Sequence, residues 1–155
     1  MIAGGVLEQM FSLDYKFAVP DVLFHEELKE QHPELPEKGL DILELAEAAI
    51  LDTVQLSAKH ARAGISNNDY LALALARQED CPLLTGDAAL RQVSILENVE
   101  GRGTLWLMGE LIEAKVITID HAASAYDAMR ADGSRLPWSD VDAQIKEFRS
   151  RSREP

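Results

Sequence analysis

Short apolar segments alternate with helical stretches along this chain. The segments KFAVP, at 16–20, and CPLLTG, at 81–86, read as strands, and each leads into a helical pattern that opens at an aspartate, Asp21 or Asp87. Parallel strands need a long, usually helical crossover between them, so such alternation is typical of an α/β fold. We therefore expect helices packed around a mostly parallel sheet. In such sheets, ligands bind at the carboxyl ends of the strands, where Asp87 is expected to lie.

Apolar periodicity and punctuation place the remaining elements in one domain at 1–148, with a basic, frayed tail at 149–155. The β-branched segment TVQLS predicts a further strand at 53–57, followed by a short helical piece at 58–63. Helices are expected over residues 4–13, 21–31, 37–52, 67–80, 88–97, 103–117, 119–133 and 137–151.

The composition narrows the possible partners. The chain has 155 residues, a net charge of −12 and a single cysteine, Cys81, so an internal disulfide is excluded. No run approaches the ~18 apolar residues of a membrane span, and we expect a cytoplasmic protein. The negative charge counts against a general nucleic-acid-binding module, because phosphate neutralisation dominates the affinity of such modules. It counts less against an enzyme that holds a few nucleotides through metal ions.

Four carboxylates admit both a structural and a functional interpretation. Asp69 lies three residues after Ser66, as in a capping box, and Asp87 is placed as a helix N-cap worth about 1 kcal/mol. Glu26 and Glu27 fit the solvated face of a helix. Carboxylates from separate elements at one end of a parallel sheet can instead bind Mg²⁺ or Mn²⁺, which prefer oxygen ligands. Thr85 is placed to orient the Asp87 carboxylate or a bound water.

Other kinds of site find no support in the sequence. There is no paired-histidine zinc motif, no nucleophile elbow and no glycine-rich phosphate loop, and Gly101-Arg102-Gly103 reads as a turn. Three arginines are candidates for contacts with RNA phosphates, although each is more often simply solvated: Arg91, Arg102 and Arg135.

The segments FAVPDVLFHEEL, SNNDYLALALA and CPLLTGDAALR, in this order, resemble the PIN-domain family of metal-dependent ribonucleases, which includes the toxins of toxin–antitoxin pairs. The resemblance extends over residues 3–115. It implies a three-layer fold, a central sheet flanked by helices, and hydrolysis of RNA phosphodiester bonds with Mg²⁺ or Mn²⁺. Glu27, with Glu26 as the substitute, Asp69 and Asp87 match the family's metal ligands, and Thr85 matches its Thr-x-Asp motif. Homodimerisation and a partner antitoxin are also implied.

One departure from the family pattern leaves the activity open. PIN proteins begin with a central strand that ends in an Asp-x-Asn-type motif, and neither precedes the first helix here. The natural chain starts upstream, or another chain supplies a strand, or this is a degenerate PIN module that binds a partner instead of cleaving RNA. Without that strand we expect a rearranged sheet or exchange between subunits. A receiver-type signalling domain is disfavoured, because its N-terminal acidic pair is absent.

Overall fold

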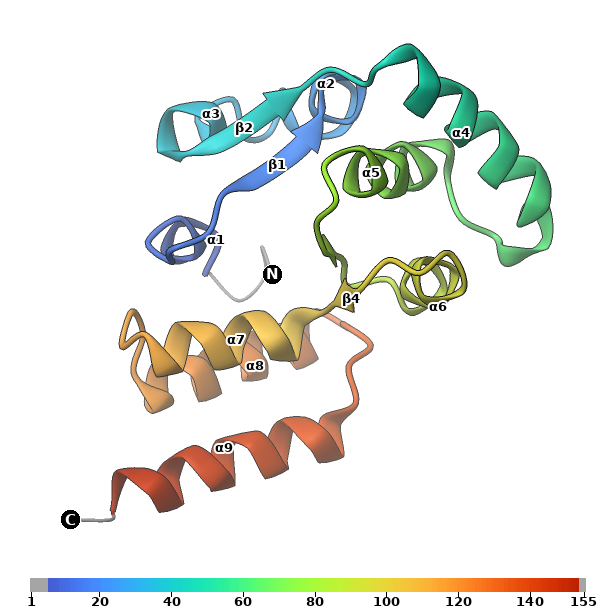
Figure 1. Ribbon diagram of the computed structural model, residues 1–155. Helices are drawn as coiled ribbons and strands as arrows, with labels where there is room; N and C mark the ends of the chain where they lie inside the picture. The colour runs from blue at the N-terminus through green and yellow to red at the C-terminus, as the bar shows by residue number, and fades with distance from the viewer. Residues whose placement is uncertain (1–5, 154–155) are drawn as a thin grey trace. The chain divides into compact units, whose positions relative to one another are not determined.

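The computed structural model describes residues 6–153 (Figure 1). Two compact units divide the chain, and we treat each by itself. The sheet unit is Lys16–Gly103, and the helical unit combines the described residues up to Tyr15 with those from Thr104 onward. The predicted site acids and Thr85 therefore all belong to the sheet unit, whereas Arg135 lies in the helical unit.

Two pairs of parallel strands form the β-structure of the sheet unit. β1 (Phe17–Pro20) pairs with β2 (Leu40–Leu43), and β3 (Leu83–Leu84) pairs with β4 (Gly101–Arg102). Helical segments connect the strands of each pair, as the alternation predicted. The mixed α/β class and the parallel pairing are thus confirmed. Among the described residues, however, the strands form two two-stranded sheets rather than one central sheet.

Helix α5 (Asn67–Gln78) organises the sheet unit. It packs against α4 (Glu47–Lys59), β1 and β3 (Figure 1). Its Ala/Leu-rich sequence is apolar on most sides, as expected for a helix covered by several neighbours. Side chains from four elements and from the loop before β4 form one core: Leu56, Tyr70, Leu73, Ala76, Leu83, Leu90, Val93 and Val99.

Two secondary-structure predictions for the segment 37–59 are wrong. The expected helix at 37–52 is interrupted, because α3 (Leu35–Lys38) ends at Gly39, whose φ of +123° breaks the helix, and residues 40–43 then pair with β1. The expected strand at 53–57 lies inside α4. There Ala49, Thr53 and Leu56 form a buried helical stripe, and packing of α4 on α5 overrides the β-propensity of the segment.

The helical unit contains α1 (Leu7–Met10), α7 (Thr104–Glu113), α8 (Ile119–Ala131) and α9 (Trp138–Ser152). A partly buried polar link joins the last three: the Tyr126 hydroxyl donates to Oε1 of Gln144 at 2.6 Å, and Nε2 of Gln144 donates to the Leu105 carbonyl at 2.9 Å. The predicted helix at 4–13 is shorter, and its residues 4–5 lie outside the described residues.

The C-terminal tail is also shorter than expected. Helix α9 continues to Ser152, which confirms the expected helix at 137–151 to within one residue at each end, so residues 149–152 belong to the helix and not to a frayed tail. Arg149 and Arg151 lie in its last turn, where positive charge is favourable to the helix dipole. No helix within residues 6–153 combines the length and the apolar character needed to cross a membrane.

The carboxylate of Glu97 ties three helices of the sheet unit together. It follows α6 (Ala88–Leu96), and its Oε1 lies 2.8 Å from both Lys59 Nζ and His60 Nε2 at the end of α4. Its Oε2 lies 3.1 Å from Nη1 of Arg77 in α5. The hydrogen bonds from Lys59 and His60 lower the pKa of Glu97 to about 2.

We expect this network to make folding sensitive to acid. Because the pKa of Glu97 is lowered on folding, its contribution is fully present above the ordinary value of 4.5 and is lost as the pH falls toward 2. Glu97→Gln should lower the free energy of unfolding at pH 7 by about 1–3 kcal/mol, since three donors lose a charged partner. Chemical denaturation between pH 2.5 and 7 measures both effects. Glu100→Gln, which removes an exposed pair with Arg102, is the matched control, and an equal loss in both variants would contradict the prediction.

Candidate functional site

A π-helical turn presents the two adjacent glutamates. The helix that begins as α2 (Asp21–Leu23) continues as η1 (Phe24–Leu28), in which Lys29 N donates to the Phe24 carbonyl at 2.8 Å, five residues back. Such turns insert one extra residue and often occur at functional sites. The sequence offered Glu27 with Glu26 as the substitute, and in the structure both glutamates turn to the same neighbour.

That neighbour is Asn68, which sequence reasoning did not single out. Its Nδ2 donates to Glu26 Oε2 at 3.0 Å and to Glu27 Oε1 at 2.9 Å, across 42 and 41 residues of sequence. One amide group therefore fixes both carboxylates against the first turn of α5. In the sequence, the only indication that Asn68 belongs to the site is its position directly before Asp69.

The structure places Asp69 in the first turn of α5, half-buried and with a raised pKa. Ser66 caps α5, and its Oγ accepts from the Asp69 N–H at 3.2 Å. Burial raises the pKa of Asp69; hydrogen bonds from Ser66 partly offset this, while the negative charges of Asp87 and then Glu27 raise it further. The three predicted acids, from η1, α5 and the start of α6, thus lie close enough for their charges to interact.

Asp87 caps α6 as predicted. Its Oδ1 accepts from Ala89 N at 2.8 Å and Leu90 N at 3.4 Å. The Thr85 hydroxyl accepts from the Asp87 N–H at 3.0 Å, so Thr85 fixes the main chain of the turn between β3 and α6. The cap employs Oδ1, and the exposed carboxylate keeps Oδ2 for another ligand.

The chemistry of these donors suits a hard divalent cation. All are carboxylate oxygens, which Mg²⁺ and Mn²⁺ prefer, and the repulsion felt at Asp69 would be relieved by positive charge. Within residues 6–153, no group of three acidic, histidine or cysteine side chains is arranged as a ready-made metal site. The side chains present therefore fit an ion held by one or two carboxylates and water, which is the usual arrangement for Mg²⁺.

Comparison of the sequence with models of known protein families identifies the family of this chain. A family model described as a PIN domain matches residues 3–150. This chain belongs to the PIN-domain family. The match includes residues of both units and extends beyond residues 3–115, which contain the motifs that carry the sequence resemblance. A search of curated proteins and a search of solved structures each found no match.

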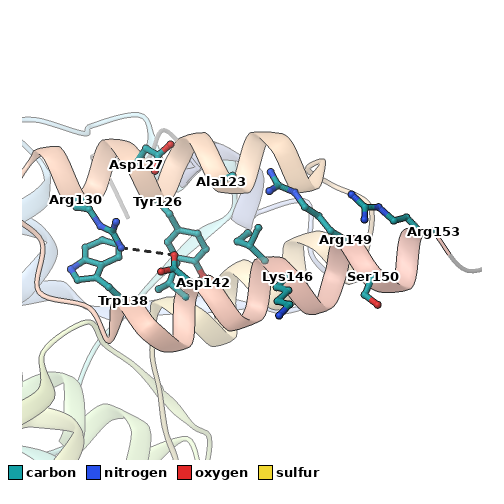
Figure 2. Close-up of a pocket in the computed structure, with 12 residues that line it drawn as sticks. Ala123, Tyr126, Asp127, Arg130, Trp138, Asp142, Lys146, Arg149, Ser150 and Arg153 are labelled. Carbon is teal, nitrogen blue, oxygen red and sulfur yellow. Dashed lines mark ion pairs between the residues drawn. The ribbon is translucent and has the colours of Figure 1, made fainter.

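The PIN domain also carries a groove of about 710 Å³ between α8 and α9, which Figure 2 shows. None of the predicted site residues lines it. Arg130 lies 4.3 Å from the centre of the Trp138 ring and 4.0 Å from Asp142, and Arg149 pairs with Asp120 at 3.4 Å. These pairings describe a seam between two helices, so the carboxylates of the sheet unit remain the candidate site.

Because the pKa of Asp69 is raised on folding, we expect the ionised side chain to destabilise the folded state. A carboxyl whose pKa is raised on folding destabilises the folded state above that pKa, and the effect disappears once the pH falls below the ordinary value of 3.8. Asp69→Asn keeps an oxygen for Ser66 and removes the charge. We expect it to raise Tm at pH 7, with a difference that shrinks toward pH 4, as measured by calorimetry. Exposed Asp132→Asn is the control, and a lower Tm for Asp69→Asn at pH 7 would count against the prediction.

Proposed function

We propose that this PIN domain is a cytoplasmic endoribonuclease that hydrolyses RNA phosphodiester bonds with Mg²⁺ or Mn²⁺. The observation that carries the proposal is the electrostatic interaction of Glu27 and Asp87 with half-buried Asp69. Acidic groups gathered at the expense of stability are characteristic of functional sites. Family membership gives the nuclease-type scaffold, and the RNA and metal specificity belong to the proposal.

Each residue has a distinct part in the proposed site. One or two of Asp69, Asp87 and Glu27 would bind the cation directly, and water would link the ion to the remainder. The Thr85 turn and the α6 cap fix Asp87, and Asn68 fixes Glu27. When bound, the ion supplies an activated water and stabilises charge developing on the phosphate. The charge of −12 over the whole chain favours an RNA held by few contacts over tight, non-specific binding.

A calorimetric titration with Mn²⁺ tests the site first. We expect saturable binding by the unaltered chain and at least about tenfold weaker binding by Asp87→Asn and Asp69→Asn, since each removes a negatively charged ligand. Asp132→Asn, an equal change of charge outside the site, should bind Mn²⁺ like the unaltered chain. Absence of binding, or equal loss in all three variants, would refute the metal site.

Cleavage is then measured on single-stranded RNA with Mn²⁺ and with EDTA. We expect Mn²⁺-dependent cleavage that both site variants abolish and that Asp132→Asn retains. Mn²⁺ binding without cleavage would instead favour the degenerate PIN module that acts as a regulatory or protein-binding domain.

The proposal includes a homodimer and a partner antitoxin. Support for the homodimer comes from an apolar stripe on the outer side of α4, where Ile50, Leu51 and Val54 are 52%, 59% and 62% exposed. Contiguous exposed apolar residues commonly mark protein interfaces, and a symmetric dimer would bury the same stripe from both subunits.

Light scattering during size-exclusion chromatography tests the dimer. We expect a dimeric mass for the unaltered chain and a monomeric mass for Leu51→Glu/Val54→Glu, because burying these charges is costly. Gln55→Glu on the same helix is the control for added charge. A monomeric unaltered chain would show the dimer proposal to be wrong without bearing on the metal site.

A further inference from the structure

The side chain of Arg91 lies across two glycines of the neighbouring segment. A Cβ atom built on Gly101 would be 2.6 Å from Cγ of Arg91 and 2.8 Å from Oγ of Ser94. A Cβ atom built on Gly103 would be 2.5 Å from Nη1 of Arg91. The arginine thus occupies the space that side chains at these two positions would need.

Space explains these glycines better than backbone conformation does. The described glycines with positive φ are Gly39, Gly64 and Gly133, so neither Gly101 nor Gly103 is required by a left-handed backbone. The Gly-Arg-Gly stretch, which reads as a turn from sequence, instead contains strand β4 and forms a trough for the arginine of α6. Glycine is common where another group must approach the backbone closely.

The trough holds the guanidinium next to the predicted site. The same Cβ position at Gly103 lies 3.5 Å from the carbonyl oxygen of Thr85, so the Arg91 head group and the Thr85-x-Asp87 turn border one small space. Arg91 also follows Asp87 by one helical turn, its N–H donating to the Asp87 carbonyl at 3.0 Å.

Arg91 has no anionic partner within the described part of the chain. Its side chain is half-buried, and no carboxylate there forms an ion pair or hydrogen bond with it. Two of the other arginines of the sheet unit are paired, Arg77 with Asp52 and Glu97 and Arg102 with Glu100, and Arg62 is exposed to solvent. A partly desolvated charge is costly unless an anion compensates it, and the planar guanidinium matches the oxygens of a phosphate.

We propose that Arg91 is a substrate-binding residue that holds a phosphate of the RNA beside the carboxylates, with Gly103 keeping the space that its guanidinium needs. The inference rests on the proposed function for the identity of the anion. It gives the acidic site a cation for gripping the RNA backbone, while the carboxylates remain available to the metal ion.

RNA binding without cleavage tests the proposal. Fluorescence anisotropy of a labelled 12-nucleotide single-stranded RNA is measured with the full chain in EDTA at several salt concentrations. Arg91→Gln should weaken binding by about fivefold or more and lower the slope of log affinity against log salt by about 1. Arg102→Gln removes the same charge from an arginine already paired with Glu100, and should change affinity less than about twofold.

Gly103→Ala tests the position of the guanidinium separately from its charge. Its methyl group would overlap only with the end of the flexible Arg91 side chain and would lie at an ordinary contact distance, 3.5 Å, from the Thr85 carbonyl oxygen. The chain should therefore fold with an unchanged Tm while the guanidinium is displaced. We expect RNA binding to weaken as in Arg91→Gln although the net charge is the same. Because Gly103→Ala keeps every charged group, it decides the question even if Arg91→Gln folds poorly.

The outcomes separate this proposal from the nuclease proposal. Unaltered binding by Arg91→Gln or Gly103→Ala, or no RNA binding by the unaltered chain, overturns the role of Arg91. If RNA binding depends on Arg91 but the chain does not cleave RNA with Mn²⁺, the role of Arg91 is supported and only the nuclease proposal is refuted.

Discussion

Burial of helix α5 is the constraint on which the sheet unit depends. Its residues from Tyr70 to Ala76 are buried except for Ala72, which is half-buried, and they pack against α4, β1 and β3. The strand pairs contribute few backbone hydrogen bonds, since β3 and β4 have two residues each, and isolated two-stranded sheets are at best marginally stable. Apolar packing on α5 therefore supplies most of what positions the strands. The same packing fixes where the first turn of α5, with Asn68 and Asp69, must lie.

The structural and functional interpretations of the acidic residues are compatible. Asp87 caps α6 through Oδ1, and Asp69 exchanges hydrogen bonds with Ser66 at the start of α5. Capping fixes each carboxylate in position, which a metal ligand also requires. Helix capping alone would not bring Glu27 and Asp87 near Asp69. Their negative charges repel that of Asp69, which is unfavourable to the folded state. Stability is commonly reduced in this way at functional sites.

Local signals predicted the parts of the fold that depend on local interactions. Ser66 and Asp87 were expected as the caps of two helices, and the side chain of each accepts a hydrogen bond from a backbone N–H within three residues of sequence. Strand β2 was missed, because Gly39 and the pairing with β1 decide its conformation. The helix at 53–57 was missed for a related reason: Thr53 and Val54 favour strands, and only the packing of α4 on α5 reverses that preference.

By itself, the sequence determined the α/β class, the family pattern and the acids of the candidate site, since each rests on residue type and short spacing. Only the tertiary structure decided how they meet. The π-turn that brings Glu26 and Glu27 to one amide depends on contacts some forty residues away in sequence. The trough for Arg91 likewise forms only when α6 packs against β4. Such arrangements depend on long-range packing, which the pattern of neighbouring residues does not specify.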